Sequence, residues 1–161
     1  AARKRKLLEN IGLEEGHEVC ECNILQADGE HSLGALMDKL DPSQPTIIIT
    51  EGLVNYFELS EIREVWSRMA DKLKLFPKGW YITDLYPDFA DHPSYRYVKL
   101  AQRLVGLFTR GQWPLHYSSD KAIQDGFGED GFSKVDVLDP ADFYGKLSNL
   151  PEVKIQTEVS N

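Results

Sequence analysis

The sequence predicts an α/β fold whose core is a doubly wound, Rossmann-like sheet of mostly parallel strands. Three observations predict this fold class. An uninterrupted β-branched run occupies residues 46–50, strand-like segments alternate with helical apolar stripes, and no repeat or linker divides the 161 residues. Alternating strands and helices favour parallel pairing through right-handed crossovers. We therefore expect a single domain over residues 1–161, with helices on both faces of its sheet.

The first strand and helix along the chain are expected at residues 19–25 and 33–40. Residues 19–25 are β-capable and lead into a polar loop. Residues 33–40 place apolar side chains at i, i+3, i+4 and i+7, which is the stripe of a short amphipathic helix, and Asp41 with Pro42 ends it.

The second pair begins with Thr46–Thr50, whose composition is typical of a strand covered on both faces. It is the most buried strand that the sequence predicts. The helix that follows repeats apolar residues from Ile62 to Leu73, with Ser60 as its expected N-cap and Pro77 beyond its end.

The third pair is a strand at residues 80–84 and a helix at residues 95–108. The tail differs, because residues 134–138 and 153–159 alternate apolar and polar side chains and are separated only by a short connection. Such alternation favours half-exposed strands. We therefore expect an antiparallel strand pair at the C-terminal edge of the sheet.

Composition limits the classes of function. Hydrophobic residues make up 42% and charged residues 27%, as in ordinary folded domains, and the formal net charge of −8 argues against a nucleic-acid partner. The basic run at residues 3–6 suits a localisation or phosphate-binding patch, but we favour the solvated face of a helix. No apolar stretch reaches the ~18 residues of a membrane span and no signal peptide is visible, so a cytoplasmic protein is expected.

Metal binding is not expected. Cys20 and Cys22 lie on one face of the strand expected at residues 19–25, and two thiols alone do not complete a four-ligand zinc site, so we expect buried structural cysteines. The histidines lack metal-ligand spacing and stand in polar loops, where surface positions are expected; they are His17, His31, His92 and His116.

The run at residues 126–131 spells G-x-G-x-x-G, but neither an apolar strand before it nor a helix after it is predicted. That fingerprint has meaning only between a strand and a helix, so we interpret the run as a loop. The chain also lacks a G-x-S-x-G nucleophile elbow and Walker or kinase phosphate loops.

Ligands of doubly wound sheets bind beyond the carboxyl ends of the strands. This rule selects Asn23, Glu51 with Gly52, and Asp84. Glu51 at the mouth of a buried strand needs a cationic or hydrogen-bonding partner, and its alternative explanation is a helix N-terminal or loop ion pair. Asn23 suits either contact with a heterocycle or a turn, and Asp84 has the same ambiguity.

The segment Thr46–Thr50 followed by Glu51-Gly52-Leu53-Val54-Asn55-Tyr56 resembles the E-G-L-x-x-Y motif of the leucine carboxyl methyltransferase family. The resemblance is strongest to the bacterial branch of tetracenomycin-type polyketide carboxyl O-methyltransferases, and it covers the C-terminal half of the family domain. It implies a class I methyltransferase sheet with S-adenosylmethionine as cofactor and a small-molecule methyl acceptor.

By this resemblance Asn23, Ile24 and Leu25 hold the adenine end of the cofactor. Glu51 and Gly52 lie near its methionine portion, and Tyr56 faces cofactor or substrate. Asn23 departs from the aspartate usual in the family, although an amide oxygen also accepts a hydrogen bond from the adenine amino group.

The family's glycine-rich turn and its acidic ribose-binding residue would both precede Ala1. We therefore expect this polypeptide alone to bind S-adenosylmethionine poorly, unless a preceding segment or a second copy of the chain completes the site.

Methyl transfer to a carboxylate needs positioning more than a general base. A phenolic acceptor needs a base, for which Tyr56 and Asp84 are the candidates. Residues 109–117, which include Arg110 and Trp113, suit a lid over an aromatic acceptor as well as a packed surface loop. Two other hypotheses remain: a non-catalytic α/β interaction domain, and a different nucleotide-binding enzyme whose phosphate loop precedes Ala1.

Overall fold

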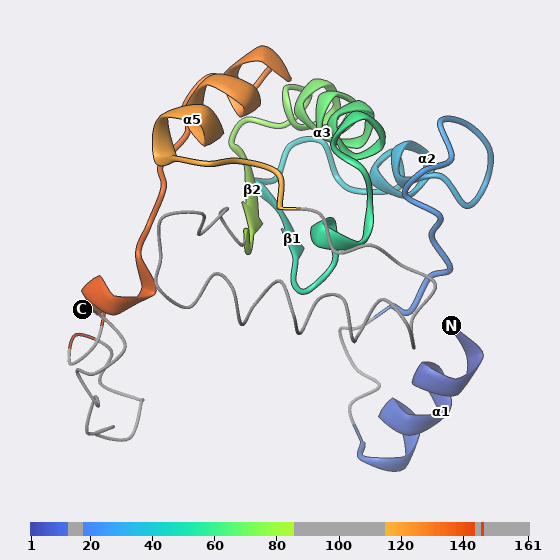
Figure 1. The fold of residues 1–161 in the computed structure, drawn as a ribbon. Helices are drawn as coiled ribbons and strands as arrows, with labels where there is room; N and C mark the ends of the chain where they lie inside the picture. Colours follow the sequence, from blue (N-terminus) through green and yellow to red (C-terminus); the bar gives the residue numbers. More distant parts are fainter. Residues whose placement is uncertain (13–17, 86–114, 144–145, 147–161) are drawn as a thin grey trace.

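The computed structural model of the chain describes residues 1–12, 18–85, 115–143 and 146. Figure 1 shows helices α3 and α5 together on one side of a small sheet, α2 beside α3, and α1 apart from them. The helices are α1 (Ala2–Asn10), α2 (Leu33–Met37), α3 (Leu59–Leu73) and α5 (Asp120–Glu129), the strands are β1 (Thr46–Thr50) and β2 (Gly79–Thr83), and the 3-10 turns are η1 (Val54–Tyr56) and η2 (Pro140–Phe143).

Strands β1 and β2 form a parallel pair, in which Thr46 lies opposite Gly79 and Thr50 opposite Thr83. Helix α3 makes the crossover between them. The described residues therefore combine helices with a small parallel sheet, and the predicted strands at residues 46–50 and 80–84 are both present, the second beginning and ending one residue earlier. The larger doubly wound sheet stays a prediction.

Helix α3 forms where its apolar stripe predicts it, and Ile62, Val65, Trp66, Met69 and Leu73 are all buried. The prediction of Ser60 as its N-cap is wrong. The helix begins two residues earlier because the N-cap is Glu58, whose backbone N–H donates to Glu61 Oε2 at 3.2 Å. Acidic groups at this end also suit the helix dipole.

Helix α2 is the predicted short helix, and it ends at Met37. Ser32 Oγ accepts a hydrogen bond from the backbone N–H of Ala35 at 3.2 Å, which caps its first turn. Residues 38–45 form turns and irregular structure before β1 begins. The apolar stripe predicted for residues 33–40 therefore continues beyond the end of the helix.

Trp66 lies at the centre of the core and is fully buried. Its ring centroid is 4.4 Å from that of Phe127 in α5 and 6.3 Å from that of Tyr117, whose ring stacks on it. Helix α5 thus packs on the same face of the sheet as α3. The buried core cluster is Val54, Ile62, Val65, Trp66, Met69, Ile123 and Phe127.

The opposite face of the sheet is exposed, contrary to the prediction that β1 is covered on both faces. Ile48 packs against the core, whereas Ile47 is 54% and Ile49 66% exposed. Alternate residues of a strand point to opposite faces, and both helices that pack on this sheet among the described residues lie on the same face. A β-branched run therefore indicates a strand but does not show how many faces are covered.

Residues 19–25 do not form the predicted strand; the chain there is irregular and ends in a turn. Their backbone groups bond elsewhere: the N–H of Asn23 donates to the His31 carbonyl at 2.8 Å, and Arg68 Nη2 donates to the Ile24 carbonyl at 3.1 Å. A strand needs its backbone groups to pair with a neighbouring strand, and these groups bond instead to a loop carbonyl and to an arginine side chain. Cys20 and Cys22 are consequently exposed free thiols, so their predicted burial is also wrong.

The G-x-G-x-x-G run is helical at its start, not a loop, because α5 extends through Glu129. Ser119 Oγ accepts from the N–H of Ala122 at 3.2 Å and caps α5, and Ile123 and Phe127 form its buried stripe. Residues 115–119, which lead directly into α5, form no strand, so the conclusion that the run is no dinucleotide fingerprint is unchanged.

The tail is only partly described. Residues 134–138 alternate in burial, with Val135 and Val137 packed against the core, but they form no strand. The pairing expected for them is therefore absent from the described residues, and residues 153–159 lie outside them. The predicted helix at residues 95–108 also lies outside the described residues.

The basic residues of α1 do form a solvated helix face, since no residue of α1 is buried. Within the described ranges, no helix is long and apolar enough to cross a membrane. Those same residues gather no cluster of three or more His, Cys, Asp or Glu side chains that would hold a metal ion.

An ion pair joins α3 to the end of α5. Arg63 Nε donates to Asp130 Oδ1 at 2.8 Å, and Arg63 Nη2 donates to Glu129 Oε2 at 2.9 Å. Asp130 is only 5% exposed. Burial raises the pKa of the Asp130 carboxyl, and the nearby guanidinium opposes this shift without cancelling it.

Acidification provides a test of this buried carboxyl. Because the pKa of Asp130 is raised on folding, the folded chain binds this proton more tightly than the unfolded chain, so the group adds stability as the pH falls through its folded pKa. Asp130→Asn lacks that contribution. We expect urea unfolding of Asp130→Asn to lose more stability than the wild type between neutral pH and about pH 4. Parallel stability curves would contradict the assignment.

Two glycines of α5 provide a matched pair of variants. A Cβ on Gly126 would lie 2.7 Å from Cε1 of Tyr117, whereas a Cβ on Gly128 meets nothing within 4 Å. Gly126→Ala should lower the free energy of unfolding by about 1–3 kcal/mol through overpacking. Gly128→Ala should raise it by up to ~1 kcal/mol through helix propensity. Denaturant titrations measure both, and equal effects would refute the packing described for Tyr117.

Candidate functional site at the carboxyl ends of the strands

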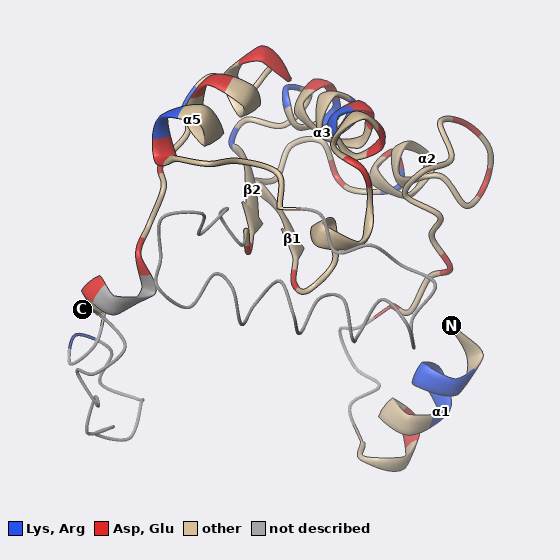
Figure 2. Ribbon diagram, in the orientation of Figure 1, with Lys and Arg blue, Asp and Glu red and all other residues tan. Residues whose placement is uncertain are grey.

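The candidate site lies where β1 and β2 end side by side. Thr50 and Thr83 are partners in the parallel register, so Glu51 and Asp84 follow the two strands at the same edge. Figure 2 shows acidic residues at both strand ends. The sequence predicted these two positions as ligand-binding spots, and the structure brings them together.

Gly52 is clamped by Asp84. The Gly52 N–H donates to both carboxylate oxygens of Asp84, at 2.9 Å to Oδ1 and 3.0 Å to Oδ2. Gly52 has a φ of +58°, in the left-handed region that glycine adopts without steric cost. The clamp therefore fixes the direction in which the chain leaves β1 immediately after Glu51.

A relay of hydrogen bonds supports the clamp from within the core. Trp66 Nε1 only donates, so it gives its proton to the Tyr81 hydroxyl at 3.1 Å. Tyr81 then donates to Thr50 Oγ1 at 2.8 Å. Thr50 donates to Thr83 Oγ1 at 2.9 Å, and Thr83 donates to the Asp84 carbonyl at 3.2 Å. Each hydroxyl uses its single proton, so the relay has one consistent direction.

Glu51 itself is exposed, and its carboxylate forms no ion pair with any of the described residues. The alternative explanation of a loop ion pair therefore finds no support there. An accessible carboxylate next to a fixed backbone turn is suited to accept hydrogen bonds from an ammonium or hydroxyl group of a ligand.

The turn η1 follows this edge and presents Tyr56, which is 67% exposed. His116 holds η1 in place: its Nε2 donates to the Val54 carbonyl at 3.1 Å, and its ring meets Trp66 edge-on at 6.1 Å. His116 is only 9% exposed, so its predicted surface position is wrong. The signal in the sequence was the pair of apolar neighbours, Leu115 and Tyr117, which mark a packed segment instead of a polar loop.

Asn23, Ile24 and Leu25 form a turn that is bound to α3 through Arg68. Asn23 Oδ1 accepts from the Leu25 N–H at 3.2 Å, and both the Ile24 and Leu25 carbonyls face Arg68. The turn that was the alternative explanation for Asn23 is therefore present. Asn23 and Glu51 are not brought together by any hydrogen bond within the described part of the chain, and Arg110 and Trp113 lie outside the described residues.

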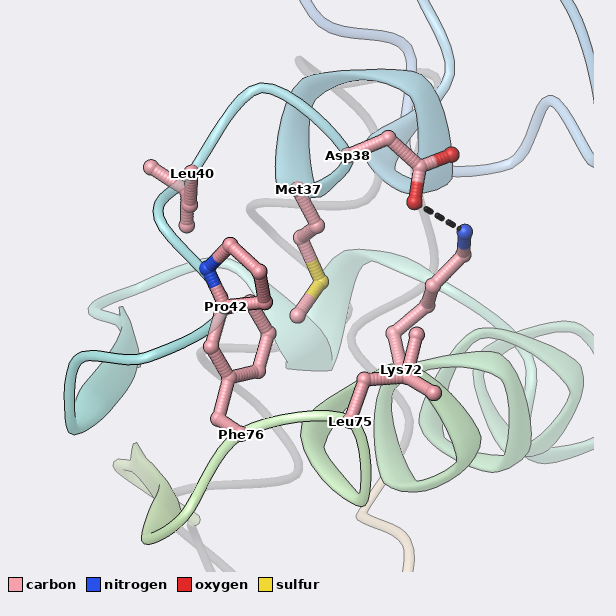
Figure 3. Close-up of a pocket in the computed structure, with 7 residues that line it drawn as sticks. All are labelled: Met37, Asp38, Leu40, Pro42, Lys72, Leu75 and Phe76. Carbon is pink, nitrogen blue, oxygen red and sulfur yellow. Dashed lines mark hydrogen bonds and ion pairs between the residues drawn. The ribbon is translucent and has the colours of Figure 1, made fainter.

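A groove of about 230 Å³ lies elsewhere, between α2 and the end of α3. Figure 3 shows Met37, Leu40, Pro42 and Phe76 lining it, with Lys72 paired to Asp38 at its rim. Residues 37–42 of the lining precede β1, and residues 72–76 lie between α3 and the start of β2. The groove is therefore near the amino ends of the two strands. Its lining is mostly apolar and offers no group for chemistry, and we place the candidate site at the carboxyl ends instead.

Comparisons of the chain with protein-family models, with curated proteins and with solved structures give no match. The interpretation of the site therefore depends on its residues and on the motif described above.

Removing the central hydroxyl of the relay tests its importance. Tyr81→Phe leaves the buried Trp66 N–H without its acceptor and removes the hydrogen bond that Thr50 Oγ1 accepts, so the free energy of unfolding should fall by about 1–3 kcal/mol. Exchange of the Gly52 amide hydrogen should also become faster, because the clamp loses its support. Tyr56→Phe is the control, since the exposed ring should change stability by no more than about 0.5 kcal/mol. Equal, small effects of both variants would refute the relay.

Proposed function

We propose that the chain is part of an S-adenosylmethionine-dependent O-methyltransferase that methylates a carboxylate or phenolic oxygen of a small aromatic or polyketide-like acceptor. The observation that best supports this proposal is the position of the motif at the carboxyl ends of the two strands. The Glu51-Gly52 pair of the E-G-L-x-x-Y motif stands at the carboxyl end of a parallel strand, with an exposed carboxylate and a clamped backbone.

The residues present fit the amino-acid end of such a cofactor. When bound, S-adenosylmethionine supplies a methyl group on a positively charged sulfonium. Glu51 is accessible and unpaired among the described residues, so it is suited to accept hydrogen bonds from the cofactor's ammonium group. The space around Gly52 is open, since a Cβ there would meet nothing within 4 Å.

The remaining residues have positioning roles in this proposal. Asp84 uses both carboxylate oxygens to hold Gly52, so it is better suited to fix the edge than to remove a proton from an acceptor. Tyr56, Arg110 and Trp113 are the proposed contacts of the acceptor. A carboxylate acceptor is already a nucleophile at neutral pH and needs alignment and exclusion of water, so the arrangement favours a carboxylate over a phenol.

One observation favours the second hypothesis, a non-catalytic interaction domain. The sheet face opposite α3 exposes several large apolar side chains, and contiguous apolar surface is typical of a protein contact. That face and the edge with Glu51 are different surfaces, so the two hypotheses predict different sensitive residues.

Calorimetry with S-adenosylmethionine tests the proposal on protein of the full gene-encoded length. The wild type should bind, and Glu51→Gln should bind about 10- to 100-fold more weakly, because a hydrogen bond to a charged group contributes roughly 1.5–3 kcal/mol. Glu30→Gln is the matched control, since Glu30 is exposed and outside the edge.

Two results would contradict parts of this proposal. A folded wild type that binds no S-adenosylmethionine would reject the methyltransferase and favour the interaction domain. Equal binding by wild type and Glu51→Gln would keep the cofactor but remove Glu51 from its site.

A further inference from the structure

The dipeptide Asp-Gly occurs three times in the chain, at residues 28–29, 125–126 and 130–131. An aspartate that precedes glycine is prone to rearrange its backbone, because glycine has no side chain to hinder the approach of its nitrogen to the aspartate carboxyl group. The three copies share this chemistry and differ in their surroundings, so the structure distinguishes which of them is free to react.

The rearrangement needs a free glycine nitrogen and a free, protonated carboxyl group. The nitrogen attacks the carboxyl carbon, a C–N bond forms, and water leaves, made from the carboxyl OH and the amide hydrogen. Water then opens the resulting five-membered succinimide ring at either carbonyl. One product is the original aspartate, and the other is isoaspartate, in which the main chain passes through the side-chain carbonyl. The net change is an isomerisation that consumes no other reactant.

The copy at residues 125–126 is held in α5. Gly126 is buried inside the helix, where each backbone N–H donates to the carbonyl four residues earlier. Lys121 Nζ lies 3.0 Å from Asp125 Oδ1 and 2.7 Å from Asp125 Oδ2, and so binds the carboxylate. Both reacting groups are therefore occupied, and the reaction has to wait for local opening of the helix.

The copy at residues 130–131 is held by the buried ion pair. The Gly131 N–H donates to the Gly128 carbonyl at 3.1 Å, and Arg63 Nε donates to Asp130 Oδ1 at 2.8 Å. Burial raises the pKa of the Asp130 carboxyl and so favours the protonated form that reacts. The bonded nitrogen and the ion pair nevertheless oppose the movement that closes the ring.

The copy at residues 28–29 has neither constraint. Both residues are exposed, and they lie in the loop that leads into α2 and projects outward in Figure 1. The Asp28 carbonyl accepts a hydrogen bond from Gln26 Nε2. Within the described part of the chain, however, neither the Asp28 carboxylate nor the Gly29 N–H forms a hydrogen bond or ion pair. The two reacting groups are therefore available to each other.

We propose that Asp28 is a site of spontaneous isomerisation to isoaspartate in the folded protein, whereas Asp125 and Asp130 are protected by their surroundings. The proposal uses only this chain's own groups, and it does not depend on the methyltransferase proposal.

Isomerisation at residue 28 adds one methylene group to the main chain of a closed loop. The loop is closed by hydrogen bonds from the Asn23 N–H to the His31 carbonyl at 2.8 Å and from the Ser32 N–H to the Gly29 carbonyl at 3.0 Å. A longer main chain disturbs the spacing of these bonds, and Ser32 is also the residue that caps α2. Exchange of the Ser32 amide hydrogen should therefore be faster in the isoaspartate form, whereas exchange at Ile123 in α5 should not change.

Peptide mapping of protein of the full gene-encoded length tests the proposal. The folded protein is kept at physiological temperature and mildly acidic pH, and isoaspartate is located by mass-spectrometric fragmentation, since Asp125 and Asp130 share one tryptic peptide. Isoaspartate should accumulate at Asp28 at least about tenfold faster than at the other two positions, which react only after local opening. Equal rates at all three positions, or an unmodified Asp28, would overturn the proposal.

The chain unfolded in guanidinium chloride is the control for local sequence. All three copies should react there at similar rates, because glycine follows the aspartate in each. A preference for Asp28 that persists in the unfolded chain would mean that the fold is not its cause, which also contradicts the proposal. Asp28→Glu is the matched variant: glutamate has to close a larger ring, so the product at residue 28 should be lost while Asp125 and Asp130 behave as in the wild type.

Discussion

The burial of Trp66 is the constraint on which the rest of the described structure depends. Its ring is the contact that joins α3 to α5, and its only polar atom must find an acceptor inside the core. Tyr81 provides that acceptor from β2. One side chain therefore fixes the distance between the helical layer and the sheet, and its N–H begins the relay that ends at Asp84.

The relay explains why two loops far apart in sequence form one edge. Parallel register alone brings the strand ends together, but it does not fix the loops beyond them. Thr83 holds the backbone of Asp84, and the Asp84 carboxylate holds the backbone of Gly52. The turn after β1 is consequently positioned from β2, and Glu51 is fixed at a boundary: Thr50 before it is buried and hydrogen-bonded, whereas its own carboxylate faces solvent.

Periodicity and position predicted the parts of the fold that depend on local sequence. The strands β1 and β2, the stripe of α3 and the meeting of Glu51 with Asp84 all follow from runs of residue types and from one rule of topology. Contacts between distant residues were not predictable in this way. His116 looked like a loop residue because its partner, the Val54 carbonyl, is far away in sequence. Residues 19–25 have strand composition, but composition does not supply a neighbouring strand. One step of the relay could have been predicted from the sequence, because aligning the two strands places Thr50 opposite Thr83.

The two faces of β1 differ in how far the described residues determine their side chains. Ile48 and Thr50 point to the α3 face, where packing and hydrogen bonds determine their identity. Ile47 and Ile49 point to the other face, where the described residues provide no packing of that kind. Isoleucine on an exposed face has no advantage in water over a polar residue, because about 25 cal/mol is lost for each Å² of apolar surface left uncovered. Packing among the described residues therefore explains the inner residues of this β-branched run, whereas the preference of β-branched side chains for strands is what explains Ile47 and Ile49.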